Sequence, residues 1–363
     1  MKFKAKKEDL LKGIQTVQNI ITPKAALPIL ANILIETLDD KVRLSATDLD
    51  IGISCVIPVQ TQEAGAITIP AKRFGEIIRD LPSDSVNIST KKNNSMAVET
   101  ESCQFKIMGL PREEFPKLPE FQNKEVIKIE QATLKQMLGL THFAVSFDET
   151  RYILNGILFQ NDKNNLTLVA TDGKRLAIAE RKIKQDVDKD VRIIVPIKTI
   201  HELTRNLKDD GDISLILGNN QALFDLNGVV VISRLIEGEF PDYKQVIPPV
   251  SENVMKAGRE EFLLAVKRAA LLSTPDYQAV KLELFKDKLV ISKSTPDIGE
   301  SREEVSVEYK GKEMAIGFNP NYLTDVLKNL SDAQVEFELI DGEKPGVIRV
   351  EGYVYIVLPM RLG

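Results

Sequence analysis

The feature of this sequence that most constrains its fold is an internal repeat that runs through the chain three times. Each unit opens with a short alternating segment and then apolar residues three and four positions apart, which predicts a strand followed by an amphipathic helix. A second helix is predicted later in each unit, with a proline near its first turn, where the missing amide hydrogen is harmless. The units open at residues 1, 125 and 253, and their later helices are IPAKRFGEIIRDL at 69–81, VPIKTIHELTRNL at 195–207 and NPNYLTDVLKNL at 319–330.

The middle of each unit repeats as well. The segments at 28–37, 152–161 and 277–286 alternate apolar and other residues and therefore predict strands. The segments that follow, SATDLDIGIS and VATDGKRLAI, place Asp48 and Asp172 in one register. We expect Asp297 in STPDIGESRE to continue this series.

The repeat also predicts the domain organisation. Two proline-rich stretches, 109–119 and 237–248, close the first two units and are expected to be linkers, which gives domains at residues 1–121, 125–249 and 252–363. Each domain is expected to hold two helices and about eight strands. The fold class is therefore α+β, with helices packed on one side of antiparallel sheets.

Composition excludes several classes of protein. The longest apolar runs, such as residues 229–232, are far too short to cross a bilayer, and the charged N-terminus does not resemble a signal peptide, so a cytoplasmic protein is expected. Cys55 and Cys103 are too few for a disulfide framework, and both are expected to be buried. The net charge of −5 still leaves room for a local basic surface.

The chain offers little for catalysis. Its only histidines, His142 and His201, have no partner motif, and no phosphate-binding glycine loop is present. Asp48 and Asp50 could suggest a metal pair, but the matching pair in the second unit has Lys174, so we interpret these aspartates as turn formers. We therefore expect no catalytic residue, metal or cofactor. A repetitive protein-binding scaffold and an enzyme with an unrecognised site stay open as alternatives.

Similar domains joined by short linkers will bend into an arc if each junction turns the same way, and two such arcs can close into a ring. Closure needs complementary ends. We expect the strand at 104–108 to be an exposed edge in domain one and the end of a helix in domain three to meet it. The candidate interface residues are Phe105, Ile107, Leu271 and Leu272, with the acidic Glu300, Glu303 and Glu304 available to Lys72 or Arg73; ordinary core and surface roles are the alternative.

Nonspecific binding of duplex DNA needs cations that face phosphates and no element that reads bases. The predicted helices carry a modest excess of lysine and arginine, and Arg79, Arg205 and Lys328 share one register near the end of the second helix of each unit. A cation at that place also compensates the helix dipole, so the alternative of an ordinary surface residue remains. The candidate DNA-facing residues among the helices are Lys72, Arg73, Arg79, Lys198 and Arg205.

Five short segments resemble the bacterial DNA sliding clamps, the beta subunits of DNA polymerase III, and the resemblance covers the whole chain. They are LPIL at 27–30, ATDGKRLA at 170–177, EGEFPDY at 237–243, NPNYLTDVL at 319–327 and LPMRLG at 358–363. The resemblance implies a non-catalytic processivity factor that forms half of a closed ring, as a head-to-tail homodimer around duplex DNA. It also implies three kinds of protein partner: a clamp loader, the alpha subunit of the replicative polymerase, and other proteins with a clamp-binding motif.

The resemblance further implies a hydrophobic groove between domains two and three that takes partner peptides. Carried over by matching motif, its residues are Leu154, Thr171, Gly173, Lys174, Arg175, Leu176, Pro241, Val246, Tyr277, Asn319, Tyr322, Val357, Leu358, Pro359, Met360 and Arg361. The sequence departs from the usual family pattern at Lys174, Gln245, Tyr277 and Leu358, so the resemblance implies the place of the groove and not a particular peptide preference. Lys24 is added to the DNA-facing candidates because the family often carries a basic residue in that loop.

Overall fold

The computed structural model describes residues 1–21, 27–91, 93–119, 121, 126–183 and 191–362. Lys24 therefore lies outside the described residues. The described chain divides into two compact units. The first comprises residues 1–132, 184–187 and 198–235, and the second comprises residues 133–183, 188–197 and 236–363. No helix in the described ranges is long and apolar enough to span a membrane.

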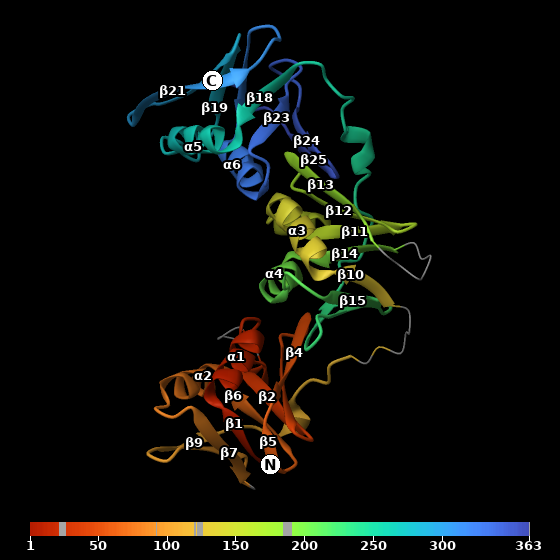
Figure 1. Cartoon of the computed structure of the whole chain (residues 1–363), viewed down its shortest axis with the longest axis vertical. Helices are drawn as coiled ribbons and strands as arrows, with labels where there is room; N and C mark the ends of the chain where they lie inside the picture. Colours follow the sequence, from red (N-terminus) through yellow and green to blue (C-terminus); the bar gives the residue numbers. More distant parts are fainter. Residues whose placement is uncertain (22–26, 92, 120, 122–125, 184–190, 363) are drawn as a thin grey trace. The chain divides into compact units, whose positions relative to one another are not determined.

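The three sequence repeats fold alike, and the prediction of two helices and about eight strands in each is confirmed for the described residues (Figure 1). The first repeat contains β1 (Lys2–Lys6), α1 (Lys7–Gln18), β2 (Asn32–Leu38), β3 (Lys41–Thr47), β4 (Ile51–Pro58), β5 (Gln60–Glu63), β6 (Ala66–Pro70), α2 (Ala71–Asp80), β7 (Ser85–Lys91), β8 (Ser95–Glu99) and β9 (Gln104–Met108). The second contains β10 (Val126–Glu130), α3 (Gln131–Thr141), β11 (Gly156–Asp162), β12 (Asn165–Thr171), β13 (Arg175–Lys182), β14 (Val191–Pro196), α4 (Ile197–Asn206), β15 (Asp212–Leu217), β16 (Gln221–Asp225) and β17 (Val229–Arg234). The third contains β18 (Val254–Gly258), α5 (Arg259–Ala270), β19 (Val280–Phe285), β20 (Lys288–Thr295), β21 (Gly299–Glu308), β22 (Met314–Phe318), α6 (Pro320–Asn329), β23 (Gln334–Glu338), β24 (Gly346–Val350) and β25 (Tyr353–Val357).

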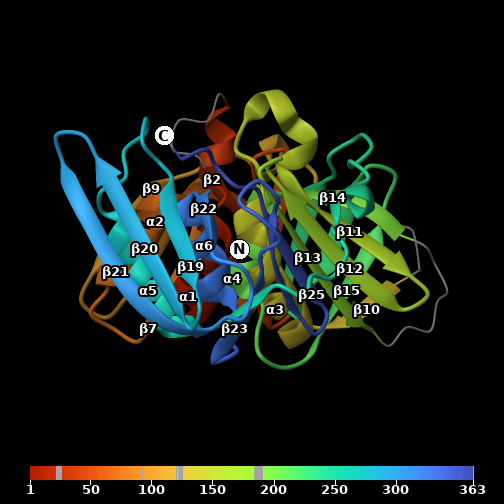
Figure 2. The same ribbon diagram turned by 90° about the horizontal axis from the view of Figure 1, so that it is seen from above.

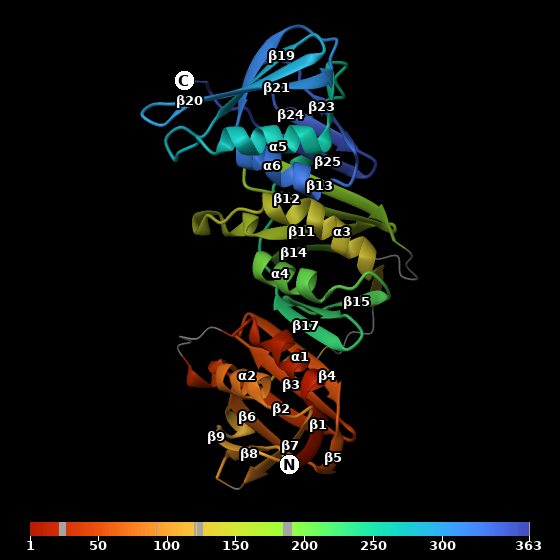
Figure 3. The same cartoon turned by 60° about the vertical axis from the view of Figure 1, so that its left-hand side comes forward.

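In the first and third repeats the two helices pack together through apolar stripes. On α1 this stripe is Leu10, Ile14 and Val17, all fully buried, and α1 contacts α2 and the strands β3 and β4. In the third repeat α5 and α6 lie side by side (Figures 1 and 3). The sequence also explains where α6 begins, since Asn319 caps it by accepting a bond from the amide of Asn321, and Pro320 takes the first helical position.

All strand pairs are antiparallel, and the sheets continue from one repeat into the next. An eight-stranded sheet in the first unit has the order β10-β15-β16-β17-β4-β3-β2-β6, so β17 of the second repeat pairs with β4 of the first. A twelve-stranded sheet in the second unit has the order β14-β11-β12-β13-β25-β24-β23-β18-β21-β20-β19-β22, so β13 pairs with β25. Figure 2 shows β19, β20 and β21 of this sheet side by side. A five-stranded sheet, β5-β1-β7-β8-β9, completes the first unit.

The loop at residues 47–51, here called the Asp48 loop, joins β3 to β4 by side-chain hydrogen bonds to its own backbone. Asp48 Oδ1 accepts from the amides of Asp50 (3.1 Å) and Ile51 (2.9 Å). The Thr47 hydroxyl donates to the carbonyl of Ile51 at 2.9 Å. Asp48 is therefore a turn former, as the sequence predicted.

The loop at residues 171–175, here called the Asp172 loop, repeats this geometry between β12 and β13. Asp172 Oδ1 accepts from the amides of Lys174 (2.8 Å) and Arg175 (3.0 Å). The Thr171 hydroxyl donates to the carbonyl of Arg175 at 2.6 Å. The two loops thus have one backbone design in two repeats.

The expected place of Asp297 in this series is wrong by one residue. Thr295 ends β20 just as the earlier threonines end their strands, and Pro296, which has no carboxylate, then occupies the aspartate position. Asp297 instead matches Leu49 and Gly173, and all three have left-handed backbones, with φ values of 62°, 82° and 85°. What the three loops share is therefore this backbone turn.

Two other expectations need correction. The segments at 28–37 and 152–161 do not begin as strands, because Pro28–Ala31 and Glu149–Leu154 are 3-10 turns that precede β2 and β11. Cys55 is buried and its burial raises the pKa of the thiol to about 12, but Cys103 is only half-buried and contacts the Thr100 hydroxyl.

Candidate functional site

The candidate groove residues all belong to the second unit, where they surround the junction of β13 and β25. The strands pair from Arg175 opposite Val357 onward, and the Leu358 amide extends the ladder by donating to the Lys174 carbonyl at 2.9 Å. On its other side the C-terminal segment is held by the Met360 amide, which donates to Gly317 O at 2.8 Å. Residues 358–360 are therefore fixed to both the second and the third repeat.

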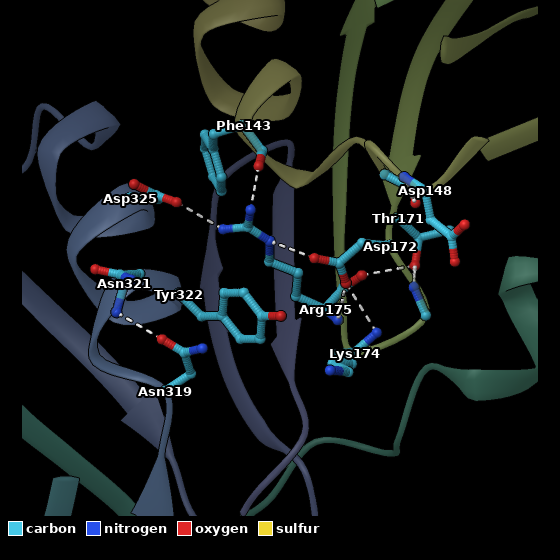
Figure 4. A network of polar contacts seen from close by, with 12 residues as sticks. Phe143, Asp148, Thr171, Asp172, Lys174, Arg175, Asn319, Asn321, Tyr322 and Asp325 are labelled. Carbon is cyan, nitrogen blue, oxygen red and sulfur yellow. Dashed lines mark hydrogen bonds and ion pairs between the residues drawn. The ribbon is translucent and has the colours of Figure 1, made fainter. Parts of the chain in front are cut away.

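Arg175 is the centre of this region (Figure 4). Its Nε lies 3.0 Å from Asp172 Oδ2 and its Nη1 lies 2.7 Å from Asp325 Oδ2 on α6. Its Nη2 donates to the carbonyl of Phe143, and its guanidinium carbon lies 4.4 Å from the centre of the Tyr322 ring. These five residues, named here the Arg175 network, join parts of the second and third repeats through one side chain.

The network keeps a buried cation charged. Burial by itself pushes the pKa of Arg175 down, but the neighbouring Tyr355, Asp325 and Asp172 outweigh it, and the pKa stays above its usual value. Burial also raises the pKa of the Tyr355 phenol, whose hydroxyl donates to the Tyr322 carbonyl at 2.8 Å. Asp172, Asp325 and the Phe143 carbonyl thus hold the guanidinium over the ring of Tyr322.

Three of the candidate groove residues expose apolar side chains. The exposed fractions are 59% for Val246, 50% for Tyr277 and 43% for Leu358, whereas Leu176 and Val357 are buried beneath. Leu154, Tyr322, Pro359 and Met360 are half-buried. Leu154 and Leu176 belong to one apolar cluster with buried residues of three further elements, namely Ile194, Tyr243 and Ile356. The region therefore combines a rigid apolar base with exposed apolar contacts, which suits a peptide with hydrophobic anchors.

A buried lysine that was not among the candidates predicted from the sequence anchors the loop that contains Tyr277. Lys293 on β20 is 6% exposed, and its ammonium donates to the carbonyls of Tyr277 (2.7 Å) and Ala279 (2.9 Å). Burial lowers the pKa of this lysine. Asn319 holds the same loop by donating to Gln278 Oε1 at 3.3 Å. A single lysine within the apolar run LVISK is the signal that could have revealed it.

Other residues near the candidate groove were also not predicted from the sequence. A hollow of about 230 Å³ has Leu154 and Pro241 among its lining residues, but Thr150, Arg151, Tyr152, Ile153 and Glu239 line it as well. Phe143 and Asp325 were missed because their role depends on contact with Arg175. Asp325 lies within the quoted segment NPNYLTDVL, so its carboxylate could have been suspected.

The candidate interface residues lie in both units, and each is described in its own. In the first unit β9 is an edge strand, as predicted, and Phe105 is 41% exposed. Ile107 is only 8% exposed and packs into the core of its own unit, so the expectation that it offers an exposed contact is wrong. Met108, at 57%, is the other apolar residue that β9 exposes.

In the second unit Leu271, just after α5, is 81% exposed, and Leu272 is half-buried. Strand β21 pairs with β20 along its whole length but with β18 only at Val307 and Glu308, so the rest of its outer edge is unpaired among the described residues. Its acidic residues have partners within the chain. Glu303 pairs with Arg268 at 2.6 Å, which lowers the pKa of the carboxyl, and Glu300 accepts from Ser294.

The candidate DNA-facing residues in the first unit lie on α2 and α4. Lys72 and Arg79 are exposed, and Arg73 pairs with Glu76 at 3.1 Å. On α4, Arg205 pairs with Glu202 at 2.5 Å, and Lys198 pairs with Asp48 of the Asp48 loop. The shared register holds, since Arg79, Arg205 and Lys328 each occupy the last turn of their helices.

Within the described ranges, no group of three or more histidine, cysteine, aspartate or glutamate side chains could hold a metal ion. The ring nitrogen Nδ1 of His142 lies 2.9 Å from the carbonyl of Leu138, one helical turn earlier. The guanidinium of Arg175 is already paired with the carboxylates of Asp172 and Asp325. The region around it therefore suits binding of a ligand through apolar contacts.

Three family models match the chain in order. They describe the N-terminal domain of the DNA polymerase III beta subunit at residues 1–119, its central domain at residues 128–242 and its C-terminal domain at residues 244–361. Curated relatives match along the full length. The beta sliding clamp of Escherichia coli K12 is 35% identical over 368 residues and that of Chlamydia pneumoniae is 31% identical over 363 residues; the matches cover 100% of this chain and 100% and 99% of those proteins.

Solved structures agree with this similarity. The crystal structure of the DNA polymerase III subunit beta from Pseudomonas aeruginosa matches with a TM-score of 0.94 at 32% identity. A sliding clamp from Bartonella birtlesii, solved bound to griselimycin, matches with a TM-score of 0.95 at 33% identity. Both matches cover 100% of each chain.

Proposed function

Because this chain belongs to the family of bacterial DNA sliding clamps, the beta subunits of DNA polymerase III, we propose that two copies close into a ring around duplex DNA and tether the replicative polymerase to it. The role is that of a processivity factor without catalytic activity or cofactor, acting on DNA in the cytoplasm. Its proposed domains are residues 1–121, 125–249 and 252–363, and the matched family models support this division.

The observation that carries the proposal is the region around the Arg175 network, which we assign to partner peptides. Val246, Tyr277 and Leu358 expose apolar surface beside an immobile centre, and preorganised apolar contacts reduce the entropy that binding a peptide would lose. The partners are the clamp loader, the polymerase alpha subunit and other proteins that carry the same short motif. The full set of groove residues predicted from the sequence remains part of this proposal.

The ring is proposed to close head to tail between two sheet edges. Strand β9 has an open edge with Phe105 and Met108 exposed, and β21 has an unpaired outer edge near the exposed Leu271. Open edges of this kind pair readily with a strand of another chain. In that arrangement Glu300, Glu303 and Glu304 would meet cations of the partner copy, in competition with contacts such as the Arg268–Glu303 pair.

Lys72, Arg73, Arg79, Lys198 and Arg205 are proposed to face the phosphates of the encircled duplex, together with Lys24, which lies outside the described residues. Several of these cations already have carboxylate partners, for example Arg73 with Glu76. Partly neutralised cations give a weak contact, which suits a ring that must slide.

The test is retention on nicked circular DNA after loading by the clamp loader. A topological ring stays on the circle at high salt and leaves after a restriction enzyme cuts the circle once. Loss from circular and cut DNA alike at high salt would contradict encirclement and favour a scaffold held by charge alone.

Two double variants test the surfaces separately. Pro359→Ala with Met360→Ala should weaken binding of a fluorescent motif peptide and leave the dimer intact. Phe105→Ala with Leu272→Ala should give monomers in analytical ultracentrifugation and leave peptide binding unchanged. A dimer that persists in the second variant would overturn the interface assignment.

A further inference from the structure

The outer side of the five-stranded sheet is unusually basic for this chain. Strand β1 alternates exposed Lys2, Lys4 and Lys6 with buried Phe3 and Ala5. Side chains of directly paired residues point to the same face, so the pairing of the sheet shows which neighbours share it. We call the solvent side formed by Lys2, Lys4, Lys6, Lys91 and Lys106 the lysine face.

The residues between these lysines are small or neutral. Lys2, Lys4 and Lys6 lie opposite Ser89, Asn87 and Ser85 on β7. Ser89 in turn lies opposite Ala97, which lies opposite Lys106. Because these neighbouring side chains are short, the longer lysine side chains extend beyond them into solvent. Alternate residues of a strand are about 6.6 Å apart and neighbouring strands about 4.8 Å, so the charges lie close together.

No carboxylate of the described chain lies in direct contact with these charges. None of the five ammonium groups forms an ion pair or hydrogen bond with a described residue. Two carboxylates lie in line with the face but not on its ammonium groups, because Glu63 lies 3.8 Å from the N-terminal ammonium and Glu99 accepts from Gln104. Five unpaired cations on one face of a chain with net charge −5 call for an anionic partner.

A hollow of about 930 Å³ adjoins the Lys4–Lys6 end of the face and indicates which kind of anion fits. Its lining includes the apolar side chains Leu11, Pro58 and Val59, and also the carboxylates of Glu8, Asp9 and Asp84. The apolar part suits a hydrophobic side chain. The carboxylates would repel any acidic group, so the hollow suits an uncharged side chain, and the acidic groups of a ligand would lie over the lysines. The face also has no aromatic side chain on which bases could stack.

We infer that the lysine face binds an acidic peptide segment of a partner protein, with one hydrophobic side chain of that segment in the adjoining hollow. The carboxylates of the peptide lie over Lys2, Lys4 and Lys6. This site is on the first unit and is separate from the groove and the DNA-facing set; of its lysines only Lys106 lies on β9, the strand proposed for the dimer interface.

The test uses a short fluorescein-labelled peptide in which glutamates alternate with serines around one phenylalanine. Fluorescence anisotropy should show binding to the full-length protein that weakens as salt is added. The variant Lys2→Ser, Lys4→Ser, Lys6→Ser should bind about tenfold more weakly, as expected for the loss of three exposed charge pairs. The matched control Lys41→Ser, Lys117→Ser, Lys208→Ser removes three exposed lysines elsewhere in the same unit and should bind like the unmodified protein.

Two further variants test which ligand binds and where it binds. Leu11→Gln should weaken binding of the peptide and leave the salt dependence of binding unchanged. Met360→Ala should not change peptide binding, because the peptide is expected to avoid the groove. Equal weakening in the Lys2 and Lys41 triple variants would overturn the site. Tighter binding of a single-stranded oligonucleotide or of a short duplex than of the peptide, with the same loss in the Lys2 triple variant, would overturn the acidic peptide as the occupant.

Discussion

The Asp48 loop and the Asp172 loop have the same backbone hydrogen bonds but differ in the residue that ends each turn. In the first, Ile51 is buried among apolar side chains, and the second carboxylate oxygen of Asp48 is free to pair with Lys198. In the second, Arg175 takes that position and turns the other Asp172 oxygen toward itself. Among the three differences between the loops, the change from Ile51 to Arg175 therefore separates a turn with a structural role from the centre of the candidate binding region.

The largest effect is expected when the distinguishing side chain is removed. Arg175→Met should lower the free energy of unfolding by about 3 kcal/mol, because it leaves Asp172 and Asp325 without their partner in a largely buried place. Ile51→Met, the matched change in the other loop, should cost less than about 1.5 kcal/mol. Urea unfolding measures both, and equal losses would show that the two positions do not differ.

The loop that contains Tyr277 sharpens the comparison, because its anchoring cation, Lys293, comes from a neighbouring strand, β20. Lys293→Met should weaken binding of a motif peptide about tenfold, since two carbonyls of the Tyr277 loop lose their donor. Lys286→Met, at an exposed position, is the control. The chain has no tryptophan, so Tyr277→Trp gives a single fluorescent reporter of this loop. An unchanged emission spectrum after Lys293→Met would contradict the anchoring role.

Removing the turn-forming carboxylates should destabilise the fold less than removing Arg175, by an amount that differs between the loops. Asp172→Ala should cost about 2 kcal/mol and Asp48→Ala about 1 kcal/mol, because both lose two bonds to backbone amides but only Asp172 also supports a buried arginine. Asp172→Asn and Asp48→Asn keep the accepting oxygen and separate the two contributions in the same unfolding assay. If Asp48→Ala proved the more costly, the assignment of roles would be reversed.

The smallest effect is expected at the left-handed position of each loop. Leu49 has φ 82° and is half exposed, whereas Gly173 has φ 85°. Leu49→Gly should raise the free energy of unfolding by about 0.5 kcal/mol, and Gly173→Leu should lower it by about 1 kcal/mol, since an L-residue is strained there. Thermal unfolding measures the sign, and two changes of the same sign would contradict a shared backbone constraint.

The features that could be predicted from the sequence are those that depend on residues a few positions apart in the chain. The repeat, the paired helices and the turn-forming role of Asp48 follow from spacing and residue type within a few positions. Asp297 was misplaced because an aspartate one residue late in the same motif looks equivalent until the backbone angles are known. Ile107 lies on the same face of β9 as Phe105, but a shared face does not say how deeply each side chain is buried.

The candidate groove was found by resemblance, and the residues that make it rigid were not. Phe143 and Asp325 are far from Arg175 in the chain, and only the folded structure brings their oxygens to its guanidinium. The burial of Lys293 was likewise invisible, because a lysine in a strand is usually exposed.

The pairing of β17 with β4 and of β13 with β25 has a consequence for synthesis of the chain. Each early strand is made long before its partner, with roughly 170 residues still to be added, which takes on the order of ten to thirty seconds on a bacterial ribosome. During that time the nascent chain carries an open strand edge that no local contact can close. Chaperone protection of the growing polypeptide is therefore most needed between completion of β4 and the arrival of β17.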